Sequence, residues 1–413
     1  RRDHLPASEI SIRPLLSSEM IPFDQPRSTL ASAHLVDRVH RLRNRSNPLV
    51  IAAARGLTQI EAQLDELRQI LLEVVDASSR GEPLTSNELN PRQLRIDITL
   101  ESINRDAFRF TFQGMRILDG ALELILDEID SERIECLHVD RFPLSNHTPT
   151  LVTVHVLKQA TRGELIYHSD IVPDDVRLRI ASSRGEKDFY FPAGISVIEV
   201  AEAINLSTDT TGVVANADHL GPADPSLSLR FMAAEFGSSQ FAEVTSLEGP
   251  FVVLDARGQP AQRGVGSDVL VRVNNIDAQG DGLDAVVDRR NFGVHLRLSE
   301  RVASGEVLTF RVVGGGVQAP GISSSSNSQP LRISFPDVRS SSLACANGRL
   351  YQLAKGQDKS LNNDVHGGLR VVDEAFASLR HHRNHLRRFG RTLDSSAVFM
   401  PDVTGDGFLL TKV

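Results

Sequence analysis

The sequence predicts an α+β protein in which an elongated α-helical coiled bundle, built from segments near both chain ends, carries an inserted β-rich outer domain. Three patterns predict this class. Apolar residues recur at steps of three and four within 57–74 and 96–110, alternate at steps of two in short segments between 122 and 313, and return to a heptad-like stripe from 365 to about 394. Helices with compatible stripes would pack as a three-helix bundle, with the β-rich part outside it.

Two helices are expected in the first part of the chain. Their apolar stripes predict an antiparallel pair of roughly three to five turns each. The loop between them offers two starts for the second helix. Thr85 and Glu88 have the spacing of a capping box, whereas Asn90 and Pro91 would place Asn at the cap and Pro at the first helical position. The sequence alone leaves both starts open.

The middle of the chain is expected to be rich in strands that end at Gly, Pro, Asp and Asn turns. The candidate strands are 122–126, 151–157, 176–180, 188–191, 228–232, 251–254, 268–273, 294–298, 307–313 and 331–335. One short helix is expected over 196–205, with Ser196 as its cap and Glu199 as the third residue of a capping box. The Ser-rich segment 322–330 is expected to be a connector.

These patterns divide the chain into five parts. The expected divisions are an atypical, partly disordered N-terminal arm (1–50), a helical pair with a hairpin (51–130), a β-rich outer part (131–330), a C-terminal return strand and helix (331–400) and a tail (401–413). The residues expected to pack in the helical bundle are Leu57, Ile60, Leu64, Leu67, Leu71, Ile96, Leu100, Ile103, Phe376, Leu379 and Leu386.

Charge and composition exclude several classes of protein. The 413 residues include 45 basic and 53 acidic side chains, a net charge of −8, which argues against general nucleic-acid binding. No apolar run is long enough to predict a membrane span. The two cysteines, Cys136 and Cys345, are expected to be free and buried rather than bridged.

No motif predicts catalytic, cofactor-binding or metal-binding residues, so we expect no enzyme, although a site assembled from distant residues would leave no motif. His381 and His385 stand four apart, as zinc ligands can, but the Glu of the H-E-x-x-H pattern is missing. The basic segment 380–391 is interpreted first as a solvated helix face, then as a contact for an acidic partner, then as a metal or nucleic-acid site. The Asp- and Gly-rich segment 277–282 predicts a hairpin turn rather than a calcium loop.

Several segments resemble bacterial flagellins. The segments are LDELRQILLEVVDAS at 64–78, NELNPRQLRIDITLESINR at 87–105, FTFQGMRILDG at 110–120 and VRVNNIDAQGDGLDAVV at 271–287. The segments 195–216, 233–244, 331–361 and 367–396 are also similar to parts of flagellins and hook-associated proteins. The resemblance covers roughly 55–396, and the expanded middle is most like flagellins of the planctomycete type. The segment 1–50 contains Pro and Arg where that family has Asn-, Ala-, Ser- and Gln-rich helices.

The resemblance implies a structural role. Its members are secreted, extracellular subunits of the flagellar filament, exported through the type III apparatus without a cleaved signal. The implied partners are further copies of the chain, hook-associated and cap proteins and an export chaperone, with no cofactor. Arg68 aligns with an arginine recognised by the flagellin-sensing Toll-like receptor, although an ion pair with Glu61 or Asp65 is the simpler interpretation. The alternative function is a secreted, non-polymerising flagellin-like or hook-associated paralogue that binds a surface partner.

Overall fold

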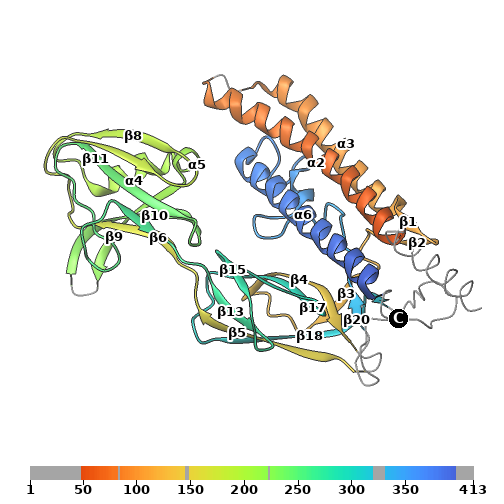
Figure 1. Cartoon of the computed structure of the whole chain (residues 1–413). Helices are drawn as coiled ribbons and strands as arrows, with labels where there is room; N and C mark the ends of the chain where they lie inside the picture. The colour runs from red at the N-terminus through yellow and green to blue at the C-terminus, as the bar shows by residue number, and fades with distance from the viewer. Residues whose placement is uncertain (1–47, 82–83, 145–147, 222–223, 320–330, 397–413) are drawn as a thin grey trace, which may run out of the picture. The chain divides into compact units, whose positions relative to one another are not determined.

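The computed structural model describes residues 48–81, 84–144, 148–221, 224–319 and 331–396. The chain is mixed α and β, with few helices and many strands (Figure 1). The expectations for the arm 1–47, for the connector up to Pro330 and for the tail 401–413 concern segments outside the described residues. No helix in the described ranges is long and apolar enough to cross a membrane.

Three long helices form one layer. They are α2 (Pro48–Ser79), α3 (Ser86–Arg109) and α6 (Val365–Ser396). The expected length of three to five turns is wrong for α2, which has 32 residues, and for α3, which has 24. The start of α2 at Pro48 also lies within the segment expected to be an arm. Proline suits the first helical position, where no N–H partner is needed, and the buried Leu49 and Ala53 extend the apolar stripe back to it.

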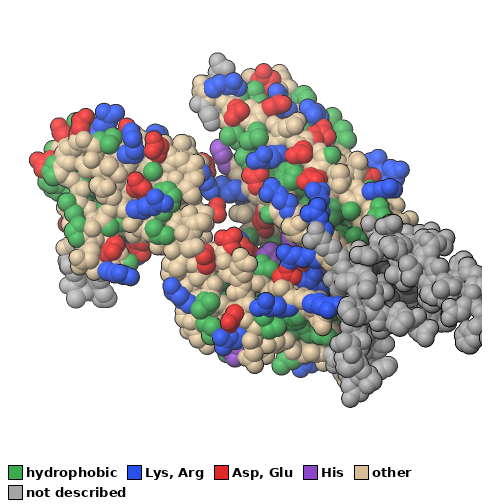
Figure 2. All heavy atoms as spheres, in the orientation of Figure 1, with side chains coloured by type: hydrophobic (Ala, Val, Ile, Leu, Met, Phe, Trp, Pro, Cys, Tyr) green, Lys and Arg blue, Asp and Glu red, His purple; other side chains and the backbone are tan. Residues whose placement is uncertain are grey.

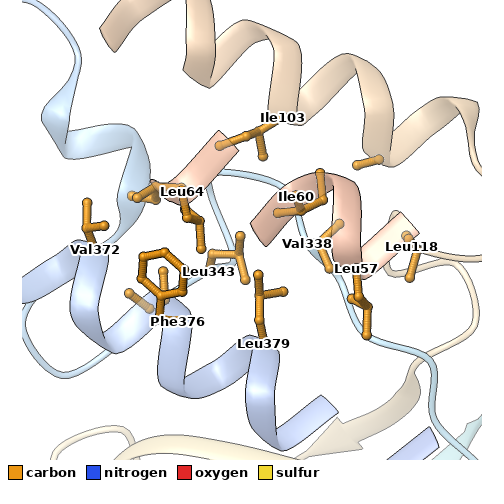
Figure 3. Close-up of a cluster of buried hydrophobic side chains, with 14 of the residues drawn as sticks. Leu57, Ile60, Leu64, Ile103, Leu118, Val338, Leu343, Val372, Phe376 and Leu379 are labelled. Atoms are coloured by element: carbon orange, nitrogen blue, oxygen red, sulfur yellow. The ribbon is translucent and has the colours of Figure 1, made fainter. Parts of the chain in front are cut away.

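The three helices share one apolar core. In Figure 1, α2 and α6, which come from opposite parts of the sequence, lie side by side, and α3 packs on α2. Figure 3 shows Leu57, Ile60 and Leu64 of α2 facing Phe376 and Leu379 of α6. Residues of β20 (Leu331–Ile333) and of the short 3₁₀ helix η1 (Leu350–Leu353) complete the same core.

The capping-box start of α3 is the one the chain adopts. The Glu88 carboxylate accepts hydrogen bonds from the Thr85 backbone N–H and hydroxyl, at 2.9 and 2.8 Å. Pro91 therefore lies inside α3 rather than at its first position. A hairpin of β1 (Thr111–Phe112) and β2 (Met115–Arg116) follows the helix.

Two antiparallel sheets pack around a second core, which contains inward-facing side chains from both sheets. In order across one sheet, the strands are β14 (Ile276–Asp277), β13 (Leu270–Val273), β5 (Thr150–Lys158), β18 (Val307–Gly315) and β3 (Leu124–Asp127). Across the other, they are β15 (Gln279–Asp281), β16 (Asp284–Arg289), β17 (Phe292–Leu298), β4 (Ile134–Pro143), β20 and β19 (Val317–Ala319). Gly282 turns β15 into β16 with φ +58°, so the hairpin predicted from Asp281–Gly282 is confirmed.

A second β module has a core of its own. Its strands are β6 (Arg162–Tyr167), β7 (Val176–Ala181), β8 (Glu186–Phe191), β9 (Val213–Gly221), β10 (Asp224–Phe236), β11 (Phe241–Glu248) and β12 (Arg263–Val265), arranged in two sheets. Its helices are α4 (Val197–Asn205) and α5 (Thr208–Thr211). The helix predicted over 196–205 is confirmed with its cap, because the Ser196 hydroxyl accepts the Glu199 N–H.

One of the predicted strands is not formed, and several strands were not predicted. The segment 251–254 contributes only isolated bridges, from Leu254 to Ile166 and to Pro260, because Phe251 and Val253 are buried in a loop that covers the module core. The sequence patterns also missed β4, β6, β9, β11 and β16. In β4 the polar residues His138, Asp140 and Arg141 obscure the alternation, since they are buried by partners that are remote in sequence.

Candidate functional site

Two neighbouring strands and one helix bring five histidines and an aspartate together. His138 and Asp140 lie on β4, His295 lies on β17 directly opposite His138, and α6 contributes three more. We refer to the following six residues as the histidine cluster: His138, Asp140, His295, His381, His382 and His385.

Local geometry explains the convergence. Side chains two apart on a strand share a face, so His138 and Asp140 both point away from the core that buries Val139. On a helix, residues three and four apart are neighbours, so His385 shares a face with both His381 and His382. The face of β4 that does not line the sandwich therefore meets one face of α6.

Asp140 is the centre of the cluster. Its carboxylate lies 3.0 Å from His381 Nε2, 3.2 Å from His138 Nε2 and 3.8 Å from His385 Nδ1. The residue is only 5% exposed. Burial alone would raise the pKa of Asp140, but the imidazoles of His385, His138 and His381 around its carboxylate outweigh burial and hold the pKa well below its usual range.

Burial favours the neutral form of the two buried histidines of α6, His382 and His385. Burial lowers the pKa of His382 well below its usual value, and it lowers the pKa of His385 to about 4 despite the nearby Asp140 charge. The pKa of His138 is raised instead. Burial works to lower it, but the Asp140 and Glu123 carboxylates outweigh burial.

Some ring nitrogens of the cluster have no hydrogen-bond partner within the described part of the chain. They are His382 Nδ1, His385 Nδ1 and His138 Nε2, the last of which lies near Asp140 without hydrogen-bond geometry. Since buried polar atoms are ordinarily paired, these three nitrogens are exceptions that need an explanation. One donor atom each from His138, Asp140 and His382 can be chosen so that all three lie within 4.8 Å of one another.

The solvated basic face expected over 380–391 is wrong for the side of α6 that faces β4. His382 and His385 are 8% and 3% exposed, and Arg383 pairs with Glu61 on α2. Arg388 pairs with Asp288, which also binds Arg141. Arg380 and Arg387 are exposed, as a basic helix face would require.

The expectation of two free cysteines is also wrong. Cys136 of β4 and Cys345 form a disulfide with an S–S distance of 2.07 Å, although they are 209 residues apart in sequence. Folding brings them together because Cys136 lies on the same face of β4 as His138. The loop after Cys345 is fixed by Glu374 of α6, whose carboxylate accepts the backbone N–H groups of Cys345, Ala346 and Asn347 at 2.7–2.9 Å.

The structure places the predicted packing residues together. The following eleven lie in the single core shared by the helices: Leu57, Ile60, Leu64, Leu67, Leu71, Ile96, Leu100, Ile103, Phe376, Leu379 and Leu386. Arg68 is half-exposed on α2 and pairs with Asp373 of α6, Nε to Oδ1 2.8 Å, rather than with Glu61 or Asp65.

The outer face of α3 exposes large apolar side chains. Leu94 and Ile98, one turn apart, are 59% and 55% exposed. On the face drawn in Figure 2, acidic and basic side chains are interspersed over the described helices. Leu94 and Ile98 therefore form a small exposed apolar strip on α3.

Sequence reasoning noticed the three members on α6, within the segment 380–391, and weighed His381 and His385 as a pair, but it missed the members on β4 and β17. The missing signal was the alternation His138–Val139–Asp140, which places two donor side chains on one face of a strand and an apolar one on the other.

Comparisons with known proteins give no family assignment. No family model matches the sequence, and no curated protein matches it. Among solved structures, the chain is similar to the flagellar cap protein FliD from Bdellovibrio bacteriovorus (13% identity, 44% of this chain, 97% of that chain, TM-score 0.30). It is also similar to FliD from Pseudomonas aeruginosa (13%, 42%, 83%, TM-score 0.29) and to FliC from Burkholderia pseudomallei (12%, 84%, 100%, TM-score 0.28). Scores this low do not assign the chain to a family.

Proposed function

We propose that the chain is a flagellin-type structural subunit of the bacterial flagellar filament, which self-assembles for motility and has no catalytic cycle. One observation carries the proposal. The segments that resemble flagellins at 64–78, 87–105 and 367–396 lie on α2, α3 and α6, and these helices share one apolar core although they come from opposite parts of the sequence. A two-ended helical bundle with an inserted β-rich part is the arrangement that the resemblance implies.

The disulfide supports an extracellular location for this subunit. Structural disulfides form and persist in oxidising compartments and are rare in the cytosol, where thiols are kept reduced. The Cys136–Cys345 bridge therefore fits a chain that is exported before it reaches its final state.

The exposed face of α3 supports assembly. Leu94 and Ile98 are a little over half exposed, so each would contribute about 1–2 kcal/mol if a second copy of the chain covered it. The proposed partners are other copies of the chain, hook-associated and cap proteins, and an export chaperone.

Arg68 belongs to the same proposal as a receptor contact. Its side chain is 46% exposed, so a partner could reach the guanidinium beside Asp373. We expect Arg68→Ala to weaken activation of the flagellin-sensing receptor, and Arg55→Ala, which changes another exposed arginine of α2, to leave it unchanged. Equal activation by the two variants would remove Arg68 from the interface.

Electron microscopy tests the function directly. The purified chain should form filaments at high protein concentration in ammonium sulfate, because excluded salts strengthen the burial of apolar surface. Filaments of uniform diameter support the proposal. A chain that stays monomeric in analytical ultracentrifugation under the same conditions would contradict it and would favour the non-polymerising or hook-associated paralogue.

A further inference from the structure

We propose that the histidine cluster is a binding site for one divalent transition-metal ion of the zinc class, with His138, Asp140 and His382 as ligands. The proposal goes beyond the structural function and does not depend on it, since a metal could bind the single chain whether or not that chain polymerises.

The donor atoms are already close to their required separation. Zinc bonds of about 2.0–2.1 Å in tetrahedral geometry put ligand atoms about 3.3 Å apart and the centres of neighbouring imidazole rings about 5 Å apart. One donor atom each from His138, Asp140 and His382 can be chosen so that all three lie within 4.8 Å, and the ring centres of His138 and His382 are 4.7 Å apart. Small side-chain rotations would bring the three donors onto one ion.

The kind of donor selects the metal. Imidazole nitrogens with one carboxylate suit zinc, copper and nickel, whereas calcium and magnesium prefer sites made of oxygen atoms. A buried carboxylate among imidazoles is therefore a transition-metal site rather than a calcium site.

Buried ring nitrogens without hydrogen-bond partners also favour a bound cation. Among the described residues, His382 Nδ1 is buried without a hydrogen-bond partner. His385 Nε2 lies 3.3 Å from the Ser334 carbonyl, so in the neutral ring its N–H donates there, and the lone pair of Nδ1 then faces the Asp140 carboxylate at 3.8 Å. Two electron-rich atoms facing each other in a buried site are stabilised by a positive ion nearby.

The surrounding residues supply what metal ligands ordinarily need. His381 Nε2 lies within hydrogen-bond distance of both Asp140 oxygens, at 3.0 and 3.2 Å, and can fix the orientation of that carboxylate. Of the three proposed ligands, Asp140 lines an open cleft, together with His381, His385, acidic residues such as Asp281 and Asp288, and the arginines Arg141, Arg289 and Arg388. The cleft reaches Asp140 between acidic and basic side chains, and we expect an ion to enter through it.

The bound ion would join α6 to β4. Because the Cys136–Cys345 disulfide starts two residues before His138, the metal and the disulfide would cross-link the helical layer to the sheet at adjacent points. A ligand that binds only the folded state stabilises it, so metal binding should raise the unfolding temperature.

The experiment is a titration of the full chain, freed of metal with EDTA, with ZnCl2 in a calorimeter and with Co2+ followed by visible absorption. We expect one ion per chain, a dissociation constant of about 1 µM or tighter, and an unfolding midpoint about 5 °C higher with zinc in large excess. His138→Ala and His382→Ala should each weaken binding about 100-fold. His168→Ala, which removes an exposed histidine of the second β module, should bind as the wild type does.

Two results would overturn the proposal. One is the absence of saturable zinc binding to the wild type. The other is equal affinity in His382→Ala and His168→Ala when both have wild-type circular dichroism in EDTA. If the ligand variants do not fold, zinc X-ray absorption of the loaded wild type decides, because a shell without imidazole scattering contradicts the site. Failure of these tests leaves the filament proposal untouched, since filaments are assayed separately.

Discussion

Gln93 of α3 is a buried amide that joins three parts of the helical layer. It is 3% exposed, its Nε2 donates to the Leu353 carbonyl at 2.9 Å, and its Oε1 accepts the Leu361 N–H at 3.0 Å. Both partners belong to the irregular segment that covers α3 before α6 begins. A single side chain thus satisfies two backbone groups that water cannot reach.

We expect Gln93→Leu to lower the free energy of unfolding by about 2–4 kcal/mol, because the Leu353 carbonyl and the Leu361 N–H lose their partner inside the protein. The same change at the exposed Gln69 of α2 should alter stability by less than about 0.5 kcal/mol. Urea denaturation of both variants measures the difference. Equal stabilities would show that water replaces the amide.

Asp337 is a second buried polar residue, and it makes stability depend on pH. Burial works to raise its pKa, but hydrogen bonds from Arg339 and Ser342 and the Arg339 charge outweigh burial and lower it. A carboxyl whose pKa is lowered in the folded state contributes stability above its unfolded pKa, and that contribution is lost as pH falls through the folded pKa.

The unfolding free energy should therefore fall as the pH is lowered from about 5 to 3, and Asp337→Asn should reduce that slope. Asp65→Asn, at an exposed position of α2, provides the matched control and should keep the wild-type slope. Denaturant midpoints across this pH range measure the effect. A wild-type slope in Asp337→Asn would exclude this carboxyl as its source.

At the scale of residues, the sequence predicted the core residues that follow a regular apolar spacing. It missed the site residues that come together only when distant segments fold against one another. Leu64 and Leu100 could be identified because a heptad stripe places them in a core whatever lies opposite. Asp140 and His381 could not be linked from the sequence, since they are 241 residues apart and neither belongs to a repeating apolar pattern.

At the scale of elements, the helices were easier to predict than the strands. α4 was found together with its cap, because Ser196 and Glu199 satisfy free N–H groups within the helix itself. β4 was missed because its burial comes from both the sandwich core and α6, which leaves no simple alternation. Because β4 lies between the sandwich core and the helical layer, its Cys136 can reach Cys345 and form the disulfide.

The disulfide should contribute strongly to the attachment of β4 to the helical layer. Closing a loop of 209 residues restricts the unfolded chain, so replacing both Cys136 and Cys345 by Ser should cost about 3–5 kcal/mol. Thermal unfolding of this variant beside the wild type measures the loss, with dithiothreitol treatment of the wild type as a second way to remove the bridge. An unchanged midpoint in both experiments would contradict a structural role.

At the scale of the whole molecule, the helical layer has both a buried and an exposed apolar face. The helices bury their inner stripe against one another, yet α3 keeps Leu94 and Ile98 on its outer face. Apolar side chains one turn apart on an exposed helix face are suited to packing against another helix. If the chain assembles as proposed, we expect α3 to be the contact through which one copy binds the next.

Sedimentation of the double variant Leu94→Gln/Ile98→Gln tests this contact most directly, with Leu206→Gln as control, because Leu206 is 90% exposed on the second β module. Both variants should fold with the wild-type unfolding temperature. The protein concentration needed to pellet filaments should rise about 100-fold or more for the double variant and stay unchanged for the control. A double variant that assembles as readily as the wild type would contradict the account.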